Sequence, residues 1–207
     1  MNTITTSSTT VPAVAPRPDD ELVERALAGD RPAFEELYRK TIRRVFSLVH
    51  RLVGSVQEAE EITQEVYCQV YRNLNRFERR SSFYTWVFRI ATNVSLQYVK
   101  WRARRAKDTP IAFVPESQLP RRGSFRELDP EREAERRAVY RKLARALERL
   151  PPGQRVVLVL GPIQGHSYEE MSKILGLGTN VIKGRLHRAR ENLRHMMLDT
   201  PEAAALN

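Results

Sequence analysis

Apolar residues recur at three- and four-residue steps along most of the chain, and this spacing predicts helices rather than strands. The first such stretch covers residues 20–53, and the pattern predicts one long amphipathic helix there. Its apolar positions are Phe34, Leu37, Tyr38, Ile42, Val45, Leu48, Val49 and Leu52. Gly54 follows directly and marks the predicted end, because glycine readily adopts the left-handed backbone that closes a helix.

A second helix is predicted from Ser55 to about Asn73. Ser55 and Glu58 have the spacing of a capping box, in which each residue satisfies a backbone N–H of the other. The apolar stripe of this helix consists of Ala59, Ile62, Val66, Val70 and Leu74. Four polar residues lie largely outside the stripe and form an acidic face, namely Glu60, Glu61, Gln64 and Glu65.

A third amphipathic helix follows the short polar segment 75–82. Its apolar positions are Phe83, Trp86, Val87, Ile90, Val94, Val99 and Trp101, and its polar side ends in Lys100, Arg102, Arg104, Arg105 and Lys107. Aromatic and basic residues alternate over residues 77–86, a composition that suits stacking on unpaired nucleic-acid bases. An aromatic core helix with a polar loop accounts for the same composition, so the pattern alone leaves both interpretations open.

Helical periodicity is lost over residues 108–130, where four prolines predict an extended, flexible linker. It returns with Val139, Leu143, Leu147 and Leu150, and the apolar run 156–160 is predicted to be a buried helix because its surroundings are helical. We therefore expect an all-α fold of two small domains, residues 19–107 and 131–199. Residues 1–18 lack the features of a secretion signal and are expected to form a disordered tail, and residues 200–207 a second tail.

The second domain contains the pattern of a helix-turn-helix. Residues 167–170 form another capping box and open a short helix that ends near Leu175. Residues 176–178 make a Gly-containing turn, Thr179 or Asn180 can cap, and a basic helix covers residues 181–198. Its apolar positions are Val181, Ile182, Leu186, Ala189 and Leu193, which leaves Lys183, His187 and Arg188 facing outward. Basic amphipathic helices are often plain solvated surfaces, but the capped partner helix and the turn favour DNA recognition.

The charge balance indicates a polyanionic partner. The 207 residues carry a formal net charge of +10, and nucleic acid is favoured over a membrane because the longest apolar run, 156–160, is too short to span a bilayer. Cys68 is the single cysteine, which excludes an internal disulfide and favours a cytoplasmic location. We expect Cys68 itself to be a small half-buried residue.

Catalytic chemistry is not indicated. The four histidines, at positions 50, 166, 187 and 195, lack metal-ligand spacing, and the sequence contains neither a Gly-rich phosphate loop nor a serine nucleophile motif. We expect no catalytic residue, no metal site and no cofactor.

Three stretches together resemble the extracytoplasmic-function (ECF) group of bacterial sigma factors: residues 59–67 (AEEITQEVY), 81–93 (SSFYTWVFRIATN) and 167–190. The resemblance covers nearly everything from residue 20 to residue 198. It implies a sigma factor that binds core RNA polymerase, recognises the minus-35 and minus-10 promoter elements and initiates transcription. It also implies an anti-sigma factor as a further partner. No insertion into a membrane is expected, because the longest apolar run is short.

The resemblance also implies roles for individual residues. The acidic face would bind core polymerase through Glu60, Glu61, Gln64 and Glu65. The melted, single-stranded minus-10 DNA would contact Phe77, Arg79, Arg80, Ser81, Ser82, Asn93 and Lys100. Duplex minus-35 DNA would contact Lys183, Gly184, Arg185, His187 and Arg188.

The chain departs from the family pattern at several of these positions. Arg79 and Arg80 stand where relatives often have glycine and an acid, and Gly184 replaces a more usual serine. The promoter sequence therefore cannot be transferred from a relative. An alternative function is a stand-alone helix-turn-helix regulator, which would need neither the acidic face nor the aromatic loop.

Overall fold

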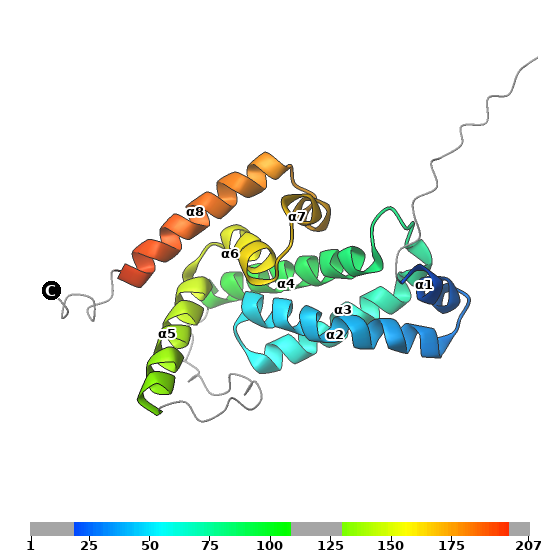
Figure 1. Cartoon of the computed structure of the whole chain (residues 1–207), viewed down its shortest axis with the longest axis horizontal. Coiled ribbons are helices and arrows are strands. Elements are labelled where there is room, and N and C mark those ends of the chain that lie inside the picture. Colours follow the sequence, from blue (N-terminus) through cyan, green and yellow to red (C-terminus); the bar gives the residue numbers. More distant parts are fainter. Residues whose placement is uncertain (1–18, 109–129, 199–207) are drawn as a thin grey trace, which may run out of the picture.

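The computed structural model describes residues 19–108 and 130–198, with side chains at 19–105 and 138–198. Every regular element in these ranges is helical (Figure 1), as the sequence predicts. The predicted tails, and residues 109–129 of the predicted linker, lie outside the described residues. The first domain contains α1 (Asp20–Leu27), α2 (Arg31–Val53), α3 (Val56–Arg72), η1 (Leu74–Arg76) and α4 (Phe83–Asp108). The second contains α5 (Pro130–Arg149), α6 (Pro152–Leu158), η2 (Val159–Ile163), α7 (Tyr168–Leu175) and α8 (Thr179–Leu198).

The prediction of one long first helix is wrong, because the chain breaks between α1 and α2. Gly29 has a positive φ of 91°, which takes the backbone out of the helix. Asp30 then caps α2, its side chain accepting a hydrogen bond from the Ala33 N–H at 3.2 Å, with a proline in the first turn. An acidic cap followed by proline is a helix-start signal, and here it interrupts an otherwise continuous apolar pattern.

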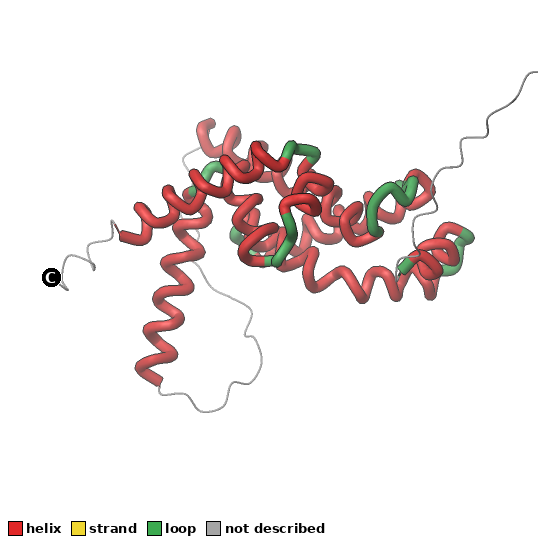
Figure 2. The backbone as a smooth tube through the Cα atoms, turned by 45° about the horizontal axis from the view of Figure 1, so that its top comes forward, coloured by secondary structure: helices red, strands yellow, loops and turns green. Residues whose placement is uncertain are grey.

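Helices α2, α3 and α4 pack side by side and form the centre of the first domain (Figure 1). Short loops join neighbouring helices of the described ranges (Figure 2). The predicted apolar stripes supply much of the core, which includes the fully buried side chains of Leu48, Val49, Val66 and Val87. The periodicity thus identified the packed faces of α2 and α3, whereas the stripe predicted for α4 missed Phe88, its largest fully buried side chain.

Three details of this domain differ from the predictions. Ser55 caps α3 by accepting from the Glu58 N–H at 3.4 Å, but the Glu58 carboxylate binds Arg102 at 2.7 Å rather than completing a capping box. Cys68 is exposed rather than half-buried. Trp101 belongs to the predicted apolar stripe, yet 44% of its surface is exposed and Arg105 lies over its ring.

The apolar run 156–160 is buried and helical, as predicted. After Leu158 the helix widens into the π turn η2, in which the Gln164 N–H donates to the Val159 carbonyl. Pro162 lies inside this turn, and a proline lacks the N–H that a regular α-helix needs there. The wider turn accommodates it and leads the chain toward α7.

The two domains pack directly against each other. α7 lies against α4, while α5, α6 and η2 contact α2 (Figure 1). Arg155 of α6 is buried at this boundary and donates to the Leu52 carbonyl at the end of α2, at 2.6 Å. It also donates to the carbonyls of Glu148 and Leu150. The buried apolar residues also form a core that continues from one domain into the other.

Candidate nucleic-acid and partner interfaces

The acidic face of α3 is fully accessible. Glu60, Glu61, Gln64 and Glu65 are all exposed, because the opposite face of α3 is anchored by buried apolar residues. Glu65 accepts a hydrogen bond from the Gln69 side chain at 2.9 Å. Within the described part of the chain, no cation lies within ion-pair distance of Glu60 or Glu61. The structure therefore brings the four predicted residues together on one surface.

The helix-turn-helix is built from α7 and α8. The predicted capping box is complete: the Ser167 hydroxyl accepts from the Glu170 N–H at 3.2 Å, and the Ser167 N–H donates to the Glu170 carboxylate at 2.8 Å. Gly176 ends α7 with a φ of 65°, a left-handed conformation that side chains disfavour. The predicted start of the second helix was late, because α8 begins at Thr179 and the Gly178 carbonyl accepts its first backbone hydrogen bond.

Helix α8 separates its apolar and cationic residues onto different faces. Ile182, Leu186 and Ala189 are buried in the second domain. The residues predicted to contact minus-35 DNA are Lys183, Gly184, His187 and Arg188, which are exposed, and Arg185, which is half-buried beside Gly153. Val181 was expected to pack inward, but it lies in the first turn and 46% of its surface is exposed.

Two of the exposed α8 residues already contact neighbouring side chains. The Lys183 ammonium lies 5.5 Å from the centre of the Tyr168 ring. His187 lies 3.5 Å from Glu191, one turn further along the helix. Both contacts are at the surface, so a bound phosphate or base could replace them at small cost.

The predicted minus-10 residues occupy two different environments. Asn93 and Lys100 are exposed along α4. Phe77, in contrast, is only 7% exposed, since its ring packs against Phe83 and Trp86, with ring centres 6.0 and 5.1 Å away. Phe77 thus lies beneath the loop that follows it rather than on its surface.

The loop side chains are engaged in local contacts. Arg79, at a positive φ of 56°, pairs with Glu24 at 2.6 Å, and Arg80 pairs with Glu78 at 2.7 Å. The Ser82 hydroxyl accepts from the Thr85 N–H at 3.1 Å and so caps α4. The half-buried Ser81 donates to the Ser82 carbonyl.

Sequence reasoning missed the contact between the domains, which involves Arg44 and Tyr84 on one side and Gln164 and His166 on the other. Of these four residues only Tyr84 falls in a stretch that carries the resemblance, and a single sequence holds no signal for packing between segments so far apart. Neither a cluster of potential metal ligands nor a helix able to cross a membrane occurs in the described ranges.

Two family models match the chain: Sigma-70 region 2 at residues 37–105, and Sigma-70 region 4 at residues 140–193. The RNA polymerase sigma-H factor of Pseudomonas aeruginosa is 31% identical over 174 residues, which cover 84% of this chain and 90% of the relative. The chain belongs to the extracytoplasmic-function group of the sigma-70 family. The ECF sigma-E factor of Escherichia coli K12 is 32% identical over 84% of this sigma factor and 91% of its own length.

Solved structures give the same result for the fold. A sigma factor from Bartonella quintana, RpoE in complex with the anti-sigma factor NepR, has a TM-score of 0.61 and 24% identity, covering 81% of this chain and 98% of its own. CnrH in complex with the cytosolic domain of CnrY has a TM-score of 0.61 and 25% identity, covering 88% and 99%. The ECF sigma factor described here is thus a non-enzymatic subunit that binds core RNA polymerase and promoter DNA and initiates promoter-specific transcription.

Proposed function

We propose that this sigma factor binds core polymerase through the acidic face of α3, reads duplex minus-35 DNA with α8, and holds melted minus-10 DNA between the loop 77–83 and α4. The observation that carries this proposal is the division of α8, where Ile182, Leu186 and Ala189 are buried while Lys183, His187 and Arg188 are exposed. A helix anchored on one face can present the other to the major groove.

The docking role rests on charge. Glu60, Glu61 and Glu65 concentrate negative charge on one helix of a chain whose net charge is +10. Such a patch is repelled by DNA and attracts a basic protein surface, so the face suits a polymerase segment better than the promoter.

The residues proposed for the minus-10 contact include exposed side chains that would touch the DNA and one buried side chain that would support the pocket. Asn93 offers an exposed amide that can donate and accept hydrogen bonds to a base edge, and Lys100 offers a cation for a phosphate. Phe77, packed under the loop, would shape the wall of the pocket from below. Arg79 and Arg80 would reach DNA by exchanging their surface ion pairs with Glu24 and Glu78 for phosphates.

An inhibitor is a further expectation. The Bartonella relative is a complex with an anti-sigma factor, and we propose that a protein of that kind also binds this chain.

The experiment that tests the assignment compares two variants in holoenzyme. Glu61→Lys with Glu65→Lys should lower the affinity for core polymerase by about tenfold or more, because two favourable charges become repulsive. Arg188→Ala should lower run-off transcription from promoters with the cognate minus-35 element by about tenfold, with core affinity unchanged. Charge reversal at the exposed Glu35 of α2 and truncation of the exposed Lys173 of α7 are the matched controls.

The outcomes separate the two roles. Unchanged core affinity in the double variant would overturn the docking assignment. If Arg188→Ala lowers transcription equally at promoters with every minus-35 sequence, Arg188 contacts phosphate and the base-reading assignment fails.

A further inference from the structure

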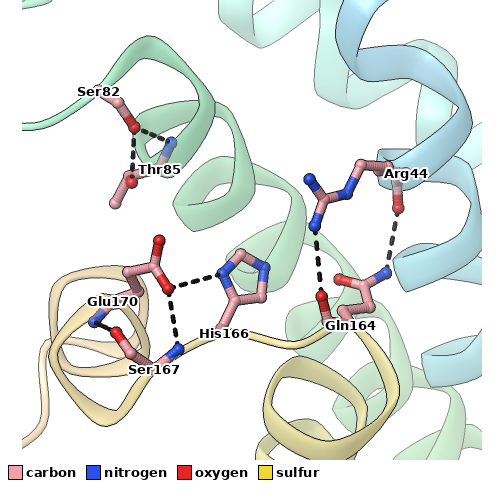
Figure 3. A network of polar contacts seen from close by, with 7 residues as sticks. All are labelled: Arg44, Ser82, Thr85, Gln164, His166, Ser167 and Glu170. Atoms are coloured by element: carbon pink, nitrogen blue, oxygen red, sulfur yellow. Dashed lines mark hydrogen bonds and ion pairs between the residues drawn. The ribbon is translucent and has the colours of Figure 1, made fainter. Parts of the chain in front are cut away.

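A reciprocal pair of hydrogen bonds joins the two domains. Arg44 of α2 donates from its guanidinium to the Gln164 carbonyl at 3.3 Å, and the Gln164 side chain donates back to the Arg44 carbonyl at 3.2 Å (Figure 3). Beside this pair, His166 packs against Tyr84 and Phe88 of α4, with ring centres 5.7 and 5.2 Å away. These residues form what we call the interdomain contact.

The imidazole of His166 is enclosed on the side that faces α4. Its side chain is only 3% exposed, and its Nε2 atom is buried without a hydrogen-bond partner. The Tyr84 hydroxyl and the Gln164 side-chain oxygen are also buried without partners. Unpaired buried polar groups regain hydrogen bonds to water when a contact opens, so they weaken the closed arrangement.

The charges around His166 come from three helices. Glu170 of α7 lies 3.8 Å from the imidazole Nδ1, but its carboxylate also accepts from the Ser167 N–H of the capping box (Figure 3). Arg44 of α2 lies 4.6 Å from the centre of the Tyr84 ring. Tyr84 of α4 stays neutral, because burial raises its pKa well above the usual range of a tyrosine. The Arg44 guanidinium thus disfavours a positive charge on His166. The Glu170 carboxylate, which also accepts from the Ser167 N–H, favours that charge.

We propose that His166 is the proton-sensitive element of the interdomain contact, and that protonation of its imidazole releases the second domain from the first. An imidazolium would place an N–H bond and a positive charge at Nε2, a buried atom that has no hydrogen-bond partner in the closed contact. Opening the contact exposes the ring to water, which hydrates that charge. The proposal goes beyond promoter recognition and does not depend on how the chain binds polymerase.

The direction of the pH dependence follows from the same surroundings. Burial lowers the pKa of His166 in the closed protein, Glu170 opposes this shift and Arg44 adds to it. The closed contact is therefore fully supported above the ordinary histidine pKa of 6.5, and it is lost as the pH falls below that value, where only the open form binds the proton. If the closed form does not bind the proton at all, the ratio of open to closed molecules rises above its value at high pH by at most about fourfold at about pH 6 and about tenfold at about pH 5.5.

Energy transfer between two dyes on the full chain measures this ratio. One dye is attached to the exposed Cys68 of α3, and the other to a cysteine that replaces the exposed His195 of α8. Transfer should be high at about pH 8 and should fall toward pH 5.5. His166→Phe keeps an aromatic ring without a titratable nitrogen and should give high transfer at both pH values. His166→Leu is a second non-titrating variant if the larger ring prevents folding.

Two further variants complete the test. Arg44→Ala combined with Gln164→Ala removes the paired hydrogen bonds and should give low transfer at both pH values. His50→Phe removes the other histidine whose pKa is lowered by burial, located on α2 against Phe46, and should leave the pH response intact. The proposal is overturned if the wild-type response is flat, if it survives in the His166 variants, or if it disappears in His50→Phe.

Discussion

Arg155 carries a charge into the boundary between the domains. It is only 4% exposed, and its guanidinium satisfies the carbonyls of Leu52, Glu148 and Leu150. These carbonyls belong to the ends of α2 and α5, where the last backbone acceptors of a helix have no partner within it. A single side chain thus donates hydrogen bonds to the ends of two helices from different domains.

We expect Arg155→Ala to lower the free energy of unfolding by about 2–4 kcal/mol, because it leaves buried carbonyls without donors. Denaturant unfolding at neutral pH measures the difference. Arg43→Ala, at an exposed position of α2, is the control and should change stability by less than about 0.5 kcal/mol. Equal effects of the two substitutions would mean that water satisfies these carbonyls as well as the guanidinium does, without a loss of stability.

At the scale of single residues, sequence reasoning predicted exposed positions better than buried contacts. Glu60, Glu61 and Lys183 were predicted to be accessible from helical spacing, and they are. The minus-10 role of Phe77 came from the resemblance, and its ring is buried because it packs against Phe83 and Trp86. His166 gave no signal, because its role depends on α4, which lies far away in the sequence.

The helix α8 combines a DNA-facing surface with an unfavourable residue. Gly184 lies in its interior, is exposed, and has no atom within 4 Å of the position that a Cβ would occupy. Glycine in a helix interior is less favourable than alanine by about 1 kcal/mol. Packing within the chain therefore does not explain why this position is a glycine.

Gly184→Ala should raise the stability of the protein by about 0.5–1 kcal/mol, because alanine restricts the unfolded chain and suits the helix. Thermal unfolding tests this expectation. Run-off transcription by the same variant then tests whether DNA approaches the backbone at this position, in which case activity falls while stability rises. The contrasting substitution is Gly54→Ala, at a φ of 91° and with a Cβ 2.6 Å from the Glu148 carboxylate, which should destabilise the protein.

At the scale of elements, periodicity predicted the helices but not their interruptions. The stripes of α2 and α3 matched the buried faces because packing repeats with the helical turn, whereas the stripe predicted for α4 omitted the buried Phe88 and Ala91. The break at Gly29 was missed because apolar residues continue on both sides of it, and the π turn at Pro162 was missed because a bulge changes the phase only locally. Such features depend on local backbone geometry, which a pattern of residue types does not encode.

Across the described ranges, an apolar core extends through both domains of the molecule. Two domains with a shared core unfold together when the contact between them is strong enough to couple them. The coupling here depends on Arg155, on the paired hydrogen bonds of Arg44 and Gln164, and on the rings around His166.

Calorimetry at about pH 8 should show a single unfolding transition for the wild-type chain. The combined Arg44→Ala and Gln164→Ala variant should show two transitions, or one whose van't Hoff enthalpy is lower than the calorimetric enthalpy. Conservative substitutions of the exposed Arg43 and Arg72 should leave the single transition unchanged. Two transitions in the wild type would show that the shared core does not couple the domains.

The interdomain contact also has a consequence for promoter architecture. Each base pair added between two recognition elements moves them apart by about 3.4 Å and rotates one relative to the other by about a tenth of a turn. A chain that stayed closed on DNA would read its two elements at one spacer length only. An open chain, whose two domains are not held in one arrangement, can follow several. Initiation at several spacer lengths would therefore show that the molecule opens before it reaches the promoter, and initiation at a single length would show that it stays closed.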